Sequence, residues 1–300
     1  MKKYPSAEEL YQAWKEIYDN EDYFYIGLLL VLFGVFFLLP IYYSVQVYRQ
    51  YNPRSLKVKY RLFVGQMAYF QNLNPLDRLL FEKRVQLFIN NKKFISRGKG
   101  FHLSDEMIAK IAASAVEISF GFPKMGFEHF SRILVYPDDY YSNITRKFHA
   151  GEVNARGFIV LSWRSFQKGY DNNDDGINLG IHEMAHALKL ENRIKNGDYH
   201  FLKAELMGDL EEEFVQYQSI RESKKENLLR SYALSNIHEF FAVLCENFFE
   251  RPQLLEEENR SLYNLMSQLL MQNPLANIGR ASSQFETVIS PKLPGPVERY

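Results

Sequence analysis

One motif has residue types and a spacing that suit chemistry, the His-Glu-x-x-His sequence formed by His182, Glu183 and His186. On a helix, side chains four residues apart share one face, so both imidazoles can bind the same metal ion. The glutamate after the first histidine can take a proton from a water molecule held there. Ile181 and Leu188 are among the apolar neighbours, which indicates a mostly buried helix. The motif therefore predicts a zinc site for peptide hydrolysis.

The two histidines leave this predicted site one ligand short. Catalytic zinc usually has three protein ligands and keeps one position for water. A metzincin would have glycine at position 189 and histidine at position 192, where this chain has Lys189 and Asn192. That class is excluded, and the third ligand is expected to be a glutamate.

Two glutamates are candidates for the third ligand. Glu205 follows the motif at roughly thermolysin-like spacing, but its segment is so acidic that a solvated helix face explains it as well. Glu239 lies in the apolar segment NIHEFFAVLCENFFE, where a buried acid is costly unless a cation pairs with it. The cost of burying an unpaired acid favours Glu239 as the third ligand, and Glu205 stays an alternative. Glu246, on the same segment, could hydrogen-bond a zinc-binding histidine.

The elements that must position these residues are expected to be mainly helical. Helical spacing of apolar residues and helix-start signals predict helices over residues 77–91, after Ser104, and over residues 177–191, 202–222 and 236–249. Strands are predicted at residues 132–136 and 157–163, with a loop over residues 137–156. The second strand could be the sheet edge that aligns an extended peptide. The fold class is α+β, predominantly helical.

The segment 171–176, which precedes the motif, partly resembles a calcium-binding loop. Asp171, Asn173, Asp175 and Gly176 match positions 1, 3, 5 and 6 of such a loop. Position 12 would be His182 in place of the usual glutamate, and no entering helix is evident. A polar turn that starts the motif helix is the favoured interpretation.

Residues 23–48 have the length and composition of a membrane span. They contain no charged residue and centre on FYIGLLLVLFGVFFLLPI, with tyrosines at both ends. The run is too long and starts too late for a signal peptide, and it is too apolar for an ordinary core helix. Lys and Arg are denser after the span than before it. We therefore expect a single-pass transmembrane helix with an external tail over residues 1–22 and a cytoplasmic domain.

The composition is that of a folded domain. Lys and Arg together number 36, as do Asp and Glu, which argues against a broadly basic nucleic-acid binder. The single cysteine, Cys245, excludes an intrachain disulfide framework. Residues 273–300 are rich in Asn, Ser and Pro and are expected to form a loose tail.

Several stretches together resemble the Mlc titration factor A family, zinc-dependent peptidases with a zincin core similar to that of anthrax lethal factor. They are LSDEMIAKIAASA, ILVYPDDY, GEVNARGFIVLSW, GIHEMAHAL and the run from Tyr232 through EFFAVLCENFFERPQLL. The resemblance implies that His182, His186 and Glu239 bind one zinc ion per chain and that Glu183 is the base. It also implies that Tyr232 donates a hydrogen bond to the oxyanion; Tyr199 is a weaker candidate for that role.

The stretches that carry the resemblance span about residues 75–275. The expected domain organisation is a zincin-like metallopeptidase domain over residues 49–272, between the transmembrane helix and the tail. Soluble bacterial members of the family lack a span, so the transmembrane helix is a departure from the family; because of that helix, the chain is expected in the bacterial inner membrane. Lys189 stands where an aspartate is common. The family's named partner, a sugar-regulated repressor, is not implied here.

Two functions follow from these observations as hypotheses. The first is a peptidase that acts on a peptide or protein. The competing hypothesis is a non-catalytic, membrane-anchored zinc-binding regulatory protein with a cytoplasmic protein partner. A fourth protein ligand on the metal would favour the second, because it would leave no position for water.

Overall fold

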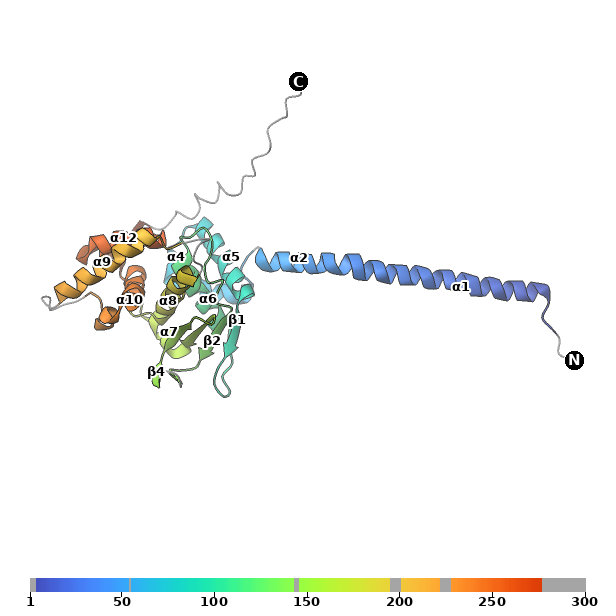
Figure 1. Cartoon of the computed structure of the whole chain (residues 1–300), viewed down its shortest axis with the longest axis horizontal. Helices are drawn as coiled ribbons and strands as arrows, with labels where there is room; N and C mark the ends of the chain where they lie inside the picture. Colours follow the sequence, from blue (N-terminus) through green and yellow to red (C-terminus); the bar gives the residue numbers. More distant parts are fainter. Residues whose placement is uncertain (1–3, 54, 143–145, 195–200, 222–227, 277–300) are drawn as a thin grey trace, which may run out of the picture. The chain divides into compact units, whose positions relative to one another are not determined.

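The computed structural model describes residues 4–53, 55–142, 146–194, 201–221 and 228–276. The chain divides into two compact units, Met1–Asn52 and Pro53–Tyr300. Figure 1 shows their elements in chain order. The predicted C-terminal tail lies outside the described residues from position 277 onward.

The first unit is helical. Helix α1 (Ala7–Phe33) starts at a capping box in which Ser6 and Glu9 satisfy each other's backbone N–H groups. A π-helical turn, η1 (Gly34–Leu38), leads into α2 (Leu39–Tyr51). Pro40 lies in the first turn of α2, and a proline, which lacks an N–H group, is a common cause of such irregular turns.

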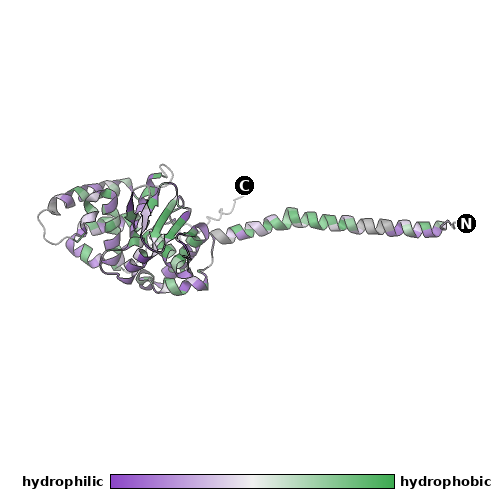
Figure 2. Cartoon of the chain, turned by 90° about the horizontal axis from the view of Figure 1, so that it is seen from below, coloured by the Kyte–Doolittle hydropathy of each residue, from purple (hydrophilic) through white to green (hydrophobic). Residues whose placement is uncertain are grey.

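Residues Tyr23–Tyr48 of this unit form a 26-residue apolar stretch that contains an 18-residue window with a mean hydropathy of 2.6. Figure 2 shows the apolar stretch along the helix. The helix is long and apolar enough to cross a membrane by length and composition, and its large apolar side chains are exposed. Only α1, η1 and α2 carry this feature within the described part of the chain.

The second unit is predominantly helical with one small sheet and a hairpin. Its helices are α3 (Val58–Gly65), α4 (Ala68–Asn72), α5 (Pro75–Asn91), α6 (Asp105–Ser119), α7 (Trp163–Asp171), α8 (Leu179–Ile194), α9 (Ala204–Arg221), α10 (Ile237–Glu250), α11 (Pro252–Glu258) and α12 (Arg260–Leu270), with 3-10 turns η2 (Ser231–Ser235) and η3 (Pro274–Ala276). Its strands are β1 (Lys93–Ser96), β2 (Arg132–Tyr136), β3 (Tyr140–Ser142), β4 (Lys147–His149), β5 (Gly151–Asn154) and β6 (Phe158–Ser162).

The four-stranded sheet has the order β1-β2-β6-β5. Strands β1, β2 and β6 are parallel, and β5 pairs antiparallel with β6. Strand β6 is therefore an interior strand, and the prediction that residues 157–163 form the sheet edge is wrong. Strand β5 occupies that position. The predicted loop over residues 137–156 is also wrong, because it contains β3, β4 and β5, which are short and too polar to be recognised from hydrophobic patterns.

The predicted helices match α5, α6, α8, α9 and α10 with ends shifted by a few residues. Helix α6 begins after Ser104, whose side chain accepts from the Met107 N–H group at 3.2 Å, as its N-cap. Strand β1 and helix α7 were not predicted. Helix α7 ends at Asp171, so an entering helix does precede the polar turn. In that turn, Asp175 Oδ1 accepts a hydrogen bond from the Ile177 N–H group at 2.9 Å. This contact agrees with the interpretation of the segment as a polar turn that starts the motif helix.

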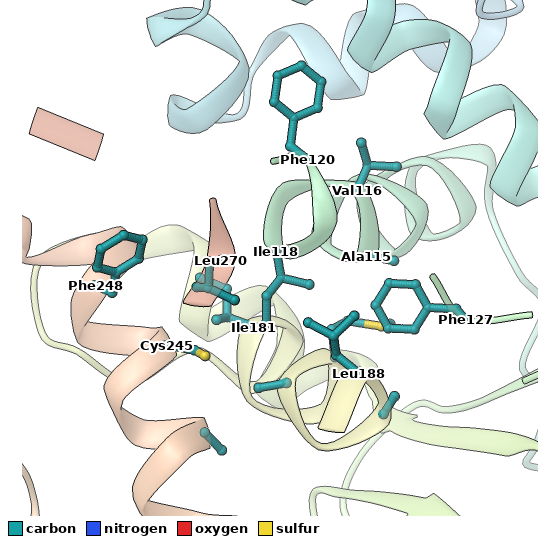
Figure 3. Close-up of a cluster of buried hydrophobic side chains, with 14 of the residues drawn as sticks. Ala115, Val116, Ile118, Phe120, Phe127, Ile181, Leu188, Cys245, Phe248 and Leu270 are labelled. Carbon is teal, nitrogen blue, oxygen red and sulfur yellow. The ribbon is translucent and has the colours of Figure 1, made fainter. Parts of the chain in front are cut away.

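Helix α8 packs against both α6 and α10 in the core. Figure 3 shows Ile181 of α8 between Ile118 of α6 and Cys245 of α10, and Leu188 beside Phe127; both α8 residues are buried. Cys245 lies on α10, buried among these apolar groups. Burial of this face fixes the rotation of α8 and turns its histidines away from the core.

A buried acid on α6 makes stability depend on pH. Tyr170 donates a hydrogen bond to Glu117 Oε2 at 3.0 Å. Burial, with a smaller contribution from the Glu250 carboxyl and against the hydrogen bond from Tyr170, raises the pKa of Glu117 from 4.5 to about 8. The folded protein keeps this proton up to about pH 8, whereas the unfolded chain releases it near 4.5. The contribution of Glu117 to stability is therefore present below 4.5 and falls as the pH rises to 8.

We expect Glu117→Gln to flatten the decline in the free energy of unfolding across this range. One such group contributes at most about 1.4 kcal/mol per pH unit to the slope. Chemical unfolding of the full-length protein at several pH values measures it, with the exposed Glu212→Gln as the control. An unchanged slope in Glu117→Gln would show that Glu117 is ionised in the folded protein.

Candidate metal centre

Three side chains of the second unit converge on one point. One ligand atom from each of His182, His186 and Glu239 lies within 4.8 Å of the other two. The Nε2 atoms of the two histidines are 3.1 Å apart. Glu239 Oε2 lies 3.1 Å from Nε2 of His182 and 3.4 Å from Nε2 of His186. A tetrahedral zinc ion with bonds of 2.0–2.2 Å places its ligand atoms about 3.3–3.6 Å apart, so this triangle nearly fits the ion.

Helices α8 and α10 supply the three side chains. Helix α8 presents His182 and His186 on one face, because the opposite face is buried in the core. Helix α10 starts at its N-cap Asn236, whose side chain accepts from the N–H groups of His238 and Glu239 at 2.9 and 3.1 Å. Glu239 thus stands in the first turn of a helix, where the helix dipole favours a carboxylate.

A hydrogen-bond chain fixes the orientation of His182. Its Nδ1 atom lies 2.7 Å from Glu246 Oε1, and Glu246 in turn accepts from Arg230 at 2.7 Å. Because the Glu246 carboxyl oxygen accepts from Arg230 and faces Nδ1, Nδ1 carries the hydrogen and Nε2 presents a lone pair. Two ring nitrogens and a carboxylate oxygen then face one another at close range, and Glu239 Oε2 is buried with no hydrogen bond. This donor set fits a cation.

The electrostatics of the site also favour positive charge. Burial would lower the pKa of His182, but contacts with Glu239 and Glu246 raise it to about 10. Burial would raise the pKa of Glu239, but the two histidines lower it well below its usual range. The carboxylates surrounding His182 therefore stabilise a positive charge at this point, which a divalent ion supplies.

Glu183 lies beside the three converging side chains and is buried. Burial raises the pKa of its carboxyl, and the two histidines oppose that shift. A carboxylate destabilised by burial is a better proton acceptor than one in water. The carboxylate packs against Gly151 of β5: a Cβ atom at Gly151 would stand 2.5 Å from Glu183 Cδ. Glycine at position 151 therefore lets the strand approach the carboxylate.

We expect Gly151→Ala to fold and to bind zinc but to lower hydrolysis. The added methyl group meets the flexible end of Glu183, so that the carboxylate shifts while the core does not. A displacement of about 1 Å can reduce a rate about 10²-fold. Steady-state kinetics, zinc content and thermal unfolding measure the three properties. Gly65→Ala is the matched control, since a Cβ atom there has no described atom within 4 Å and the residue lies on α3, outside the hollow that holds Glu183. Equal rates in the two variants would contradict this role for Gly151.

Tyr232 lies at the same site. Its ring centroid is 6.2 Å from that of His182, and the residue is 52% exposed. Burial, with the nearby carboxylates of Glu239 and Glu183, raises the pKa of Tyr232 to about 12. The phenol therefore keeps its proton at neutral pH and can donate a hydrogen bond. Tyr199 lies outside the described residues.

Two other residues considered in the sequence have different positions. Glu205 is exposed in the first turn of α9 and is not one of the three converging side chains. Lys189 Nζ donates to the Ile237 carbonyl at 3.2 Å, so it links α8 to the start of α10. Burial lowers the pKa of Lys189 to about 8. Lysine at this position thus supports the helix end that carries Glu239.

Sequence reasoning did not find Arg230 or Gly151. Arg230 precedes η2 in a segment without regular periodicity, and its pairing with Glu246 depends on the tertiary fold. Gly151 begins a short strand that was predicted as loop, so its close approach to Glu183 had no local signal. The contact of Glu246 with His182 was predicted, because both residues lie on helices with clear periodicity.

A helix with His-Glu-x-x-His beside a glutamate from a later helix defines a metallopeptidase-type protein. Comparison with known families agrees with this class. The family of glucose-regulated metallo-peptidases M90 matches residues 47–270. The chain belongs to this family.

Known relatives support the same assignment. Mlc titration factor A of Escherichia coli O127:H6 is 30% identical over 220 residues, which cover 66% of this chain and 80% of the relative. The protein of the same name from Shigella flexneri serotype 5b matches to the same extent. An uncharacterised protein of Synechocystis is 28% identical over 250 residues, or 76% of this chain and 89% of its own length. The resemblance to Mlc titration factor A is confirmed.

Proposed function

We propose that this protein is a zinc-dependent metallopeptidase with a zincin-like catalytic domain over residues 49–272. The observation that carries the proposal is the convergence of His182, His186 and Glu239, with a buried Glu183 beside them. Two imidazoles and one carboxylate are a donor set that zinc accepts in catalytic sites, with a position left for water. Family membership supports a metal-dependent peptidase.

Each residue of the site has its own role in the proposed peptide hydrolysis. A bound zinc ion supplies a Lewis acid that polarises a peptide carbonyl and makes water more acidic. Glu183 holds the attacking water and takes its proton, and later gives that proton to the leaving amine. Tyr232, protonated at neutral pH, donates to the oxygen on which negative charge develops. Glu246 and Arg230 keep His182 in the tautomer and orientation that binding requires.

The location of the activity is part of the proposal. We infer that residues 23–48 anchor the chain in the bacterial inner membrane as a single-pass helix. The excess of Lys and Arg after the span supports a cytoplasmic catalytic domain and an external tail over residues 1–22. The substrate is then a peptide or protein in the cytoplasm.

A second function is a zinc-binding regulatory protein without catalysis. The name of the relatives, Mlc titration factor A, states that they titrate the protein Mlc, which supports a cytoplasmic protein partner here. Three ligand side chains converge among the described residues, without a fourth, and this favours the enzyme. A buried proton acceptor beside them is needed for hydrolysis and is not needed in a purely structural site.

Removal and return of the metal tests the proposal. The full-length protein in detergent is treated with a chelator, then supplied with zinc, and hydrolysis of a denatured protein mixture is followed at each stage. We expect hydrolysis to disappear with the metal and to return with about one zinc ion per chain. Zinc binding without hydrolysis of any peptide would favour the regulatory protein.

A further inference from the structure

Helix α3 exposes apolar side chains on one of its faces. Tyr60 and Val64 are buried in the core, whereas Val58 and Leu62 are 82% and 67% exposed. The members of each pair are four residues apart, so each pair shares one face of the helix. Because a helix turns by about 100° per residue, positions two apart point to opposite sides. The exposed pair therefore points away from the core.

Helix α5 has a similar exposed face. Leu76, Leu79 and Lys83 are exposed and are spaced three and four residues apart, which places them on one side of the helix. Phe81 and Val85 on another side are buried in the core. Burial of those two residues fixes the rotation of α5, so its exposed leucines also point away from the core.

Two polar contacts align α3 with α5. The Lys57 N–H group, just before α3, donates to Gln86 Oε1 at 2.9 Å. Arg61 Nε lies 3.0 Å from Glu82 Oε1. Four residues forward along α3 thus correspond to four residues backward along α5, so the two helices run antiparallel and side by side. Their exposed sides meet along this line.

The exposed sides of α3 and α5 together form one surface, which we call the α3–α5 face. Its exposed apolar members are Val58, Leu62, Leu76 and Leu79. Its exposed basic members are Lys57, Lys59, Arg61 and Lys83. Asp105 and Glu82 pair with two of these basic groups, so the face keeps a net positive charge. Residues 49–84 contain eight Lys and Arg against two Asp and Glu, although the whole chain is balanced.

The chemistry of this face fits an anionic lipid surface. Apolar side chains flanked by Lys and Arg are typical of helices that lie in a membrane interface. Anionic headgroups attract basic residues close to a membrane-spanning segment. Val58 follows Tyr48, the end of the apolar stretch, by ten residues, and ten residues reach at most about 36 Å. A membrane that holds this stretch would therefore have its headgroups within reach of the face.

We propose that the α3–α5 face binds the anionic headgroups of the membrane in which the chain is anchored, with its four apolar side chains in the headgroup region. The proposal rests on the anchor described under the proposed function and not on peptidase activity. The second unit is then held against the membrane surface by its own residues as well as by the anchor.

The test measures how close Val58 lies to lipid. Val58→Cys gives the full-length protein an exposed thiol for a fluorescent dye, since its single cysteine, Cys245, is buried. The labelled protein is placed in nanodiscs that carry a lipid-bound quencher and contain phosphatidylcholine, alone or with about one quarter phosphatidylglycerol. We expect quenching to be about twofold stronger in the anionic discs. Val215→Cys, at a position on α9 that is 63% exposed, is the matched control and should show equally weak quenching in both.

Charge reversal tests the basic members of the face. Lys57→Glu combined with Lys83→Glu should remove the difference in quenching between the two kinds of disc. Lys99→Glu combined with Lys147→Glu changes two exposed lysines outside α3 and α5 and should keep the difference. Thermal unfolding of both double variants checks that they fold as the wild type does. A difference that survives the first double variant would contradict recognition through these lysines.

The remaining outcomes separate this proposal from the anchor. Weak quenching at position 58 in protein that co-elutes with the discs would overturn the docking and leave the anchor intact. Protein that does not co-elute with the discs would overturn the anchor and the docking together. Equally strong quenching in neutral and anionic discs would overturn the recognition of anionic headgroups. A dye at position 58 that becomes shielded in detergent as the protein concentration rises would assign the face to a second copy of the chain.

Discussion

Glu183→Gln is expected to lower peptide hydrolysis about 10²–10⁴-fold while zinc stays bound. The amide has nearly the shape of the carboxylate, so it fits against Gly151 in the same space, but it cannot accept a proton from water. The proposed zinc ligands His182, His186 and Glu239 are unchanged. Initial rates and zinc content measured on the same preparation separate loss of the base from loss of the metal.

The control for this variant is Glu205→Gln. Glu205 is an exposed glutamate outside the three converging side chains, so its amide should leave both rate and zinc content unchanged. If Glu183→Gln retained hydrolysis within a few fold of the wild type, Glu183 would not be the base.

Glu239→Ala is expected to weaken zinc binding more than about 100-fold. Loss of a side chain that hydrogen-bonds a metal ligand typically lowers the affinity for the metal 10–100-fold. Loss of a side chain that binds the metal directly should lower it more. Glu239 has a side chain only 16% exposed but stands in the first turn of α10, so the change should not open the core. Competition with a chromophoric chelator measures the affinity.

Glu205→Ala is the matched comparison, because it removes the rival glutamate suggested by sequence spacing. Zinc that binds the folded state stabilises it by an amount that increases with the logarithm of the ratio of free zinc to Kd, so the rise in melting temperature on zinc addition gives a second readout. Of the two variants, only Glu239→Ala is expected to show a smaller rise in melting temperature than the wild-type protein. Weakened binding in Glu205→Ala, with normal binding in Glu239→Ala, would assign the third ligand to Glu205.

Local patterns predict the parts of this fold that carry the motif. Helices α6, α8 and α10 show strong apolar periodicity, and Ser104 marks the start of α6, so their existence follows from sequence. Strands β3, β4 and β5 have three or four residues each, with polar and glycine residues among them. Pairing with neighbours determines such strands, and no local signal reveals it.

The site was predictable to the extent that its residues lie on those helices. Spacing alone identifies His182, Glu183 and His186 as one group. Preference for Glu239 came from the cost of burying an acid in an apolar helix, yet the residue stands in the first turn, where capping by Asn236 and the helix dipole also favour it. Arg230 acts through a tertiary contact with Glu246, which sequence spacing does not encode.

The zinc content of the purified full-length wild-type protein, by elemental analysis, tests the central claim most directly. The convergence of His182, His186 and Glu239 predicts about one zinc ion per chain, bound tightly enough to survive purification. Folded protein that holds no zinc, and takes up none when zinc is supplied, would contradict both the metal centre and the peptidase.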